Sequence, residues 1–214
     1  MVGNSQLFPY KHNEGQFEVL VPLRNAKFAF QPDWPALTNL DIELDFINDG
    51  LWMKTDGVNL AARASNLTAV IPDYSKEKLL IDADIKGPGK AVGPYFDETP
   101  LKTWATLQEL QLDGDVNARL HLDIPLNGEL VTAKGEVTLR NSLFIKPLDS
   151  TLKNLSGKFS FINSDLQSEP LTASWFNQPL NVDFSTKERA KAYQVAVNLN
   201  GNWQPAKTGV LPKR

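Results

Sequence analysis

The chain has 214 residues, of which 42% are hydrophobic, and its formal net charge is −3. This length allows one large or two smaller domains with a sizeable core, and the composition is that of a globular protein. The chain has no cysteine and no block of like charges, which excludes disulfides and thiolate chemistry and argues against a nucleic-acid partner.

Alternation of apolar and polar residues runs through most of the chain and is typical of strands that bury one face. We predict a mainly β, antiparallel fold from it. The apolar members of this alternation are, in chain order, Leu40, Ile42, Leu44, Phe46, Leu79, Ile81, Ala83, Ile85, Val116, Ala118, Leu120, Leu122, Ile124, Val131, Ala133, Val137, Leu139, Leu155, Phe159, Phe161, Leu180, Val182, Phe184, Tyr193, Val195, Val197 and Leu199.

Turn signals separate these strands and predict a meander with short connections. The signals are Asn48-Asp49-Gly50, Asp56-Gly57, Asp113-Gly114 and Asn127-Gly128. The alternation stops from about residue 88 to residue 110, where the stretches 91–96 and 101–110 are expected to form short helices.

One stretch of strand pattern occurs twice, 115 positions apart. Leu37, Asn39, Leu40, Phe46, Ile47, Asn48 and Leu51 recur as Leu152, Asn154, Leu155, Phe161, Ile162, Asn163 and Leu166. A repeat of this kind predicts structural units that share one architecture. We expect a first unit over residues 1–87, a helical connector over 88–112, a second unit over 113–201 and a truncated connector or tail over 202–214.

Searching the sequence for chemistry yields no catalytic, cofactor-binding or metal-binding set. Its two histidines, His12 and His121, are too few for a metal cluster, and His121 is expected on a solvated strand face. Carboxylates such as Asp41, Glu43 and Asp45 suit glycoside chemistry or calcium in principle, but an outward strand face explains them. Asn154 begins a glycosylation sequon, although a structural asparagine at a strand entry is the better interpretation.

Three groups of residues resemble AsmA-like envelope proteins: the stretch 17–25, the stretch 28–34, and the paired Asn-Leu…Phe-Ile-Asn blocks. This resemblance implies a repeating β-groove, an elongated curved antiparallel sheet with a short helical connector. It further implies a non-enzymatic segment of a periplasmic bridge that carries phospholipids between the inner and outer membranes of a Gram-negative bacterium. The apolar residues named above would line the groove and hold acyl chains, without a cofactor.

The same resemblance implies that the longer parent protein contacts both membranes and is anchored in the inner one by a segment outside this chain. An alternative from the residues alone is a closed β-sandwich, a structural or adhesion module in which the apolar residues form a dry core. A weaker alternative is an enzyme that uses the carboxylates for glycoside chemistry. The oligomeric state, headgroup preference and transport direction stay open.

Overall fold

The structure, a computed structural model, describes residues 1–29, 35–59, 63–91, 112–144, 152–189 and 192–202. Its strands are β1 Val2–Gly3, β2 Gly15–Gln16, β3 Glu18–Phe28, β4 Leu37–Ile47, β5 Gly50–Asn59, β6 Arg63–Ile71, β7 Lys78–Pro88, β8 Leu112–Pro125, β9 Thr132–Phe144, β10 Leu152–Ile162, β11 Asp165–Ser168, β12 Leu171–Trp175, β13 Gln178–Arg189 and β14 Ala192–Asn200. Three-residue 3-10 helices lie at η1 Ser5–Leu7, η2 Tyr74–Lys76 and η3 Gly89–Ala91. The helices expected within 92–110 lie outside the described residues.

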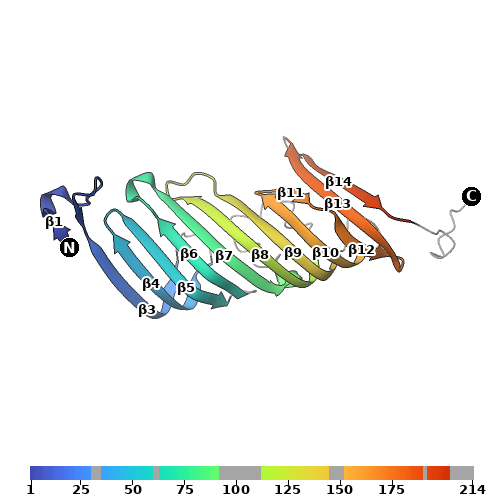
Figure 1. Cartoon of the computed structure of the whole chain (residues 1–214), viewed down its shortest axis with the longest axis horizontal. Helices are drawn as coiled ribbons and strands as arrows, with labels where there is room; N and C mark the ends of the chain where they lie inside the picture. The colour runs from blue at the N-terminus through green and yellow to red at the C-terminus, as the bar shows by residue number, and fades with distance from the viewer. Residues whose placement is uncertain (30–34, 60–62, 92–111, 145–151, 190–191, 203–214) are drawn as a thin grey trace, which may run out of the picture. The chain divides into compact units, whose positions relative to one another are not determined.

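Apart from the small β1–β2 pair, the described strands form one 12-stranded sheet with the order β11-β13-β12-β10-β9-β8-β7-β6-β5-β4-β3, in which β14 also pairs with β13. The chain divides into two compact units, the first made of Met1–Ile85 and Arg119–Gly135 and the second of Lys86–Ala118 and Glu136–Arg214. Strands β3 to β6 lie side by side in chain order within the first unit (Figure 1). The predicted mainly β, antiparallel fold is confirmed.

In the second unit, β11 and β12 together act as a single interrupted strand. Both pair with β10 on one side and with β13 on the other. The interruption falls at Glu169 and Pro170, and the Glu169 backbone N–H still donates to the Lys158 carbonyl at 3.0 Å. Proline has no N–H to donate, so the ladder breaks there and resumes in β12. Hydrogen-bonded neighbours in this unit are therefore chain neighbours, as a meander requires.

The sequence repeat is visible at the level of strands. β4 and β10 are each 11 residues long and lie 115 positions apart. Each ends in a two-residue turn, because Ile47 pairs with Gly50 and Ile162 pairs with Asp165. The asparagines that open these turns, Asn48 and Asn163, both have positive φ. The division into repeat units with a connector over 88–112 stays a prediction.

Two of the four predicted turns are confirmed. The Asn48-Asp49 pair forms the β4–β5 hairpin, and Asn127-Gly128 lies in the β8–β9 connection with a Gly128 φ of 87°. The other two turn predictions are wrong, because Asp56-Gly57 lies inside β5 and Asp113-Gly114 lies inside β8. Gly114 has the positive φ expected of a turn, 104°, but it adopts it within a continuous strand.

Left-handed asparagines interrupt the alternation at four places inside strands. Asn25, Asn39, Asn66 and Asn154 have φ between 50° and 54°. Each sits between two apolar residues that are three positions apart and are both at least partly buried; these pairs are Leu23 and Ala26, Leu37 and Leu40, Ala64 and Leu67, and Leu152 and Leu155. At Asn25, Asn39 and Asn154 the register shifts, so a β-bulge adds one residue and bends the strand locally, whereas β6 keeps one register with β5 across Asn66. The extra residue keeps the apolar side chains on one face across the bend.

Residues before β3 pack against the hairpin ends of the first unit. The Lys11 ammonium lies 2.7 Å from the Asp49 carboxylate and 3.7 Å from that of Asp73. Asn48 and Phe17 exchange two hydrogen bonds, from the Phe17 N–H to Asn48 Oδ1 at 2.8 Å and from the Asn48 N–H to the Phe17 carbonyl at 2.9 Å. These contacts fasten the N-terminal segment to the β4–β5 and β6–β7 turns.

Asn39 offers a test of the bulge, because it is exposed and has a φ of 53°. We expect Asn39→Val to lower the free energy of unfolding by about 1–2 kcal/mol, since a β-branched residue strains the left-handed conformation. Asn39→Gly removes the same side chain without that strain and should remain close to wild type. Urea unfolding followed by tryptophan fluorescence measures both. Equal losses in the two variants would contradict a conformational role for Asn39.

Candidate functional site

The candidate site is the apolar face of the sheet, and in the first unit it is largely buried. The predicted lining residues Leu40, Ile42, Leu79, Ala83, Leu122, Ile124 and Ala133 are buried there. Leu44, Phe46, Ile81, Ile85, Leu120 and Val131 are partly buried. The alternation therefore places these side chains on the less accessible face of their strands.

In the second unit the same face is more varied. Among the predicted residues, Val116, Val137, Leu139, Leu155, Phe159 and Val182 are buried, and Ala118, Phe161, Leu180, Phe184 and Val197 pack against them from partly buried positions. Val195 and Leu199 on β14 are 48% and 40% exposed. Tyr193 lies in β14, and its side chain is outside what the structure describes. The apolar face thus becomes accessible along β14, which pairs with β13 (Figure 1).

Sequence reasoning missed the share of this face that comes from β5 and β6. Met53, Val58, Ala64, Ala69 and Ile71 are all buried. Their pattern was hidden by Thr55, a polar residue at a buried position, and by the three-residue spacing around Asn66. On β6 the signal that would have found them is an asparagine directly before the second of two apolar residues that are three positions apart, as in Ala64-Ser65-Asn66-Leu67.

No second layer covers the apolar face among the residues that the structure describes. Within each unit the long strands all belong to the same sheet, and the described helices are single 3-10 turns. A closed sandwich needs two sheets whose inner faces pack about 10 Å apart. The described parts of neither unit contain that second sheet, beyond the two-residue strands β1 and β2.

Buried hydroxyl groups of the second unit form hydrogen bonds with backbone groups of the protein. Thr186 Oγ1 accepts a hydrogen bond from the Leu166 N–H at 2.8 Å and donates to the Ser164 carbonyl at 3.2 Å. Ser168 Oγ accepts from the Phe184 N–H at 2.7 Å. These hydroxyls satisfy backbone groups between β11 and β13, where the ladder is sparse. They therefore leave the face chemically apolar.

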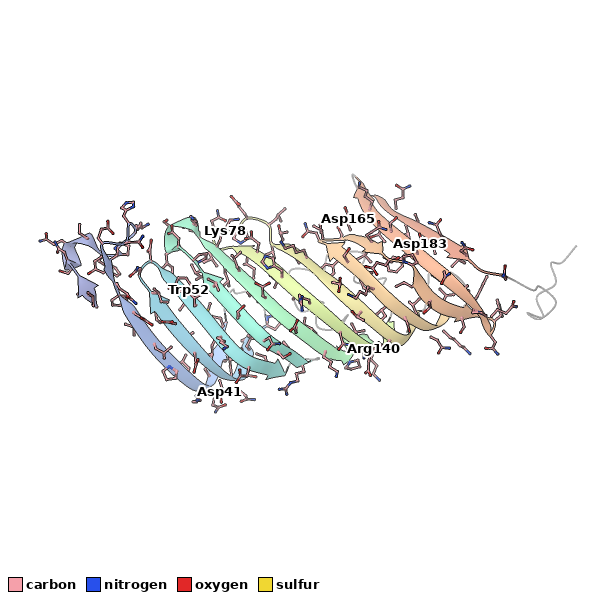
Figure 2. All side chains as sticks on the ribbon, in the orientation of Figure 1. Asp41, Trp52, Lys78, Arg140, Asp165 and Asp183 are labelled. Carbon is pink, nitrogen blue, oxygen red and sulfur yellow. The ribbon has the colours of Figure 1, made fainter. Side chains whose placement is uncertain are left out.

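The opposite, polar face carries cross-strand pairs of charged and amide groups. In the first unit, His121 Nδ1 lies 2.8 Å from Asp82 Oδ1, and Lys78 Nζ donates to Asp123 Oδ2 at 3.1 Å. His121 is thus on the polar face as predicted, but it is partly buried and paired with a carboxylate. In the second unit, Lys158 Nζ donates to Glu136 Oε1 at 2.8 Å. Figure 2 shows Lys78 beside the hairpin end of β7.

The glycosylation sequon at Asn154, like a second one formed by Asn66-Leu67-Thr68, begins with a structural asparagine. Asn66 and Asn154 both have a left-handed backbone, and their side-chain amides donate to Asp84 Oδ2 at 2.9 Å and to Ser174 Oγ at 3.4 Å, respectively. This arrangement supports the interpretation of Asn154 as a structural residue. Among the described residues, no group of three or more histidine, aspartate or glutamate side chains is placed to hold a metal ion. No helix in the described parts is long and apolar enough to cross a membrane.

A one-sheet antiparallel meander with one apolar and one largely polar face defines a class of amphipathic β-sheet proteins. Comparison with known proteins identifies the family within that class. The model of the family described as YhdP protein matches residues 1–213, so the chain belongs to the YhdP family. The family-level resemblance predicted from the sequence is thereby confirmed.

A curated relative, the Intermembrane phospholipid transporter YhdP of Escherichia coli (strain K12), is 95% identical over 215 residues. The match covers 99% of this chain and 17% of that protein. The chain therefore spans about a sixth of the length of the relative. No solved structure matches the chain.

The hydrogen bond from the Asn66 amide predicts the titration of Asp84. The Asn66 amide, and after it the Arg119 guanidinium, lower the pKa of Asp84 below its ordinary value. A lowered pKa stabilises the fold above the pKa of the unfolded chain, and this contribution is lost as the pH falls through the folded-state pKa. We expect Asn66→Gly, which keeps the left-handed backbone, to raise the pKa of Asp84 towards the ordinary value in a carboxyl-carbon NMR titration. Asn25→Gly, at a bulge, should leave it unchanged; an equal shift in both variants would contradict a specific contact.

Proposed function

We propose that this chain is one segment of a phospholipid-conducting bridge. Its apolar face holds acyl chains while the headgroups stay in water, and it catalyses no reaction. The observation that carries the proposal is an apolar face that extends over successive strands and reaches 48% exposure at Val195 and 40% at Leu199 on β14. The name of the 95% identical relative, an intermembrane phospholipid transporter, supports the choice of ligand.

The physical basis is the replacement of water around acyl chains. Each methylene that leaves water gains about 0.8 kcal/mol, and the headgroup keeps its hydration if one side of the trough is open. Leucine, isoleucine, valine and phenylalanine contact an alkyl chain without directional demands. We therefore expect binding that is broad across acyl chains. The buried hydroxyls of Thr186 and Ser168 are already hydrogen-bonded to backbone groups of the protein and do not select among ligands.

The location follows from the same proposal. A bridge between membranes places this chain in the periplasm of a Gram-negative envelope, and the contacts with the two membranes belong to the longer protein. The chain's length relative to its 95% identical relative, 17%, fits one section of such a bridge. In this arrangement the residues of the apolar face, including those of β5 and β6, form the lining of a groove.

Native mass spectrometry tests whether lipid is bound. Gently purified protein should carry co-purifying phospholipid, with adducts of several acyl compositions, because apolar contacts do not discriminate strongly among chains. Its fold is checked in the same preparation by circular dichroism. A folded preparation that repeatedly contains no phospholipid would count against the groove and favour the closed sandwich with a dry core.

A matched pair of variants on β14 tests which face holds the acyl chains. Val195 lies on the apolar face opposite Thr186, and the exposed Ala196 points to the other face. The test uses a phospholipid that carries a photoreactive acyl chain. We expect Val195→Asp to lower the crosslinking yield several-fold, because an alkyl chain that contacts a carboxylate removes water from the charge at a cost in free energy. Ala196→Asp should crosslink as wild type does.

Both variants change exposed positions, so both should keep the wild-type urea midpoint. Similar crosslinking losses in the two variants would show that the lipid does not select the apolar face. Unfolding of Val195→Asp alone would indicate a sealed core at this strand.

A further inference from the structure

A row of four register partners, three of them apolar, crosses the polar face of the first unit, where alternation would place charge. It consists of Leu20 on β3, Asp45 on β4, Trp52 on β5 and Val70 on β6, which are successive register partners. Leu20 is 60% exposed and Trp52 is 36% exposed, and Val70 is partly buried. Trp52 is labelled in Figure 2. Single exposed apolar residues are ordinary, but three in one row form a patch.

The one polar member of the row has an unmet hydrogen-bonding demand. Asp45 Oδ1 is buried and has no hydrogen-bond partner among the described residues. Its register partners are Leu20 and Trp52, neither of which places a cation beside it. Lys54 is the register partner of Glu43, one step further along the strands. The side chain as a whole is only partly buried, so its negative charge is not neutralised within the row and a cation docked over the row would be favoured.

The surroundings of the row determine which kind of partner fits it. Glu18 and Glu43 are exposed on the same face, on the strands that hold Leu20 and Asp45. Together with Asp45 they repel an anionic lipid surface. They also disfavour a symmetric contact with a second copy, which would bring like charges together. A cation with apolar neighbours is complementary to this surface.

The spacing of the row specifies the partner further. Four adjacent strands place Leu20 and Val70 roughly 14 Å apart, three inter-strand distances of about 4.8 Å. In an extended segment, residues four positions apart are separated by about 13 Å, and their side chains point to the same side as that of the residue between them. The middle residue then lies over Asp45 and Trp52. A guanidinium suits that position, because it stacks on an indole and donates to a carboxylate at once.

We propose that the row Leu20–Asp45–Trp52–Val70 is a docking surface for an extended protein segment of the pattern apolar-x-arginine-x-apolar. The arginine stacks on the Trp52 indole and pairs with the partly exposed Asp45 carboxylate, and the two apolar side chains cover Leu20 and Val70. This surface lies on the face opposite the acyl-chain lining. It is therefore independent of the proposed lipid transport.

The test uses the full chain labelled with ¹⁵N and a synthetic peptide, acetyl-Leu-Ser-Arg-Ser-Leu-amide. The Trp52 indole N–H is assigned by its loss in Trp52→Phe, among five tryptophans. We expect the peptide to shift this resonance saturably and the same peptide with glutamate in place of arginine to leave it unchanged. Asp45→Asn should weaken binding about fivefold, the loss of an exposed or half-exposed ion pair.

Asp115→Asn removes the same charge from an exposed position on β8 and serves as the matched control. Its affinity for the peptide should equal that of wild type, and the spectra of both variants report whether the fold is kept. The proposal is overturned if the arginine peptide causes no saturable shift, if the glutamate peptide shifts the indole equally, or if Asp45→Asn binds as wild type. It is also overturned if phosphatidylglycerol vesicles, and not the peptide, shift the indole.

Phospholipid co-purification in Asp45→Asn separates this proposal from the lipid function. We expect it to equal that of wild type, because Asp45 lies on the opposite face from the acyl chains. A loss of lipid in this variant would place the carboxylate in lipid binding and overturn its assignment to a separate docking surface.

Discussion

The structure depends on keeping apolar side chains on one face of strands that are not regular. A strand alternates its side chains with a period of two, so one added residue would turn everything beyond it to the other face. At Asn25, Asn39 and Asn154 the added residue takes a left-handed conformation, and the next apolar residue is three positions away from the last. Asparagine tolerates this conformation better than other residues with a side chain, except aspartate and histidine. The bulges thereby reconcile bent strands with a continuous apolar face.

The left-handed asparagines also bind carboxylates on neighbouring strands. The Asn25 N–H donates to Asp41 Oδ1 at 2.9 Å, and the Asn66 amide donates to Asp84 Oδ2 at the same distance. The backbone N–H at the Asn25 bulge and the side-chain amide of Asn66 thus both find a carboxylate partner on the neighbouring strand. The outward carboxylates that could suggest enzymatic chemistry have a structural explanation at these positions, since they satisfy backbone and amide groups.

Much of the fold could be predicted from alternation alone. Long amphipathic strands such as β4 and β8 carry their own signal, and the turn at Asn48 follows from two residues that favour positive φ. Asp56-Gly57 and Asp113-Gly114 were assigned to turns because the same residues that favour turns also favour irregularities inside strands. Local propensity cannot separate these outcomes; the pairing of the flanking residues with neighbouring strands decides them.

The site was harder to predict than the fold, because burial depends on neighbours as well as on the pattern. Val195 and Val182 both belong to apolar alternations, yet one is 48% exposed and the other 3%. β13 has a partner on both sides, whereas β14 pairs with β13 alone in the described sheet. The sequence marks both residues as members of the apolar face, and only the strand order distinguishes the buried one from the accessible one. Strand order therefore carries information about accessibility that composition does not.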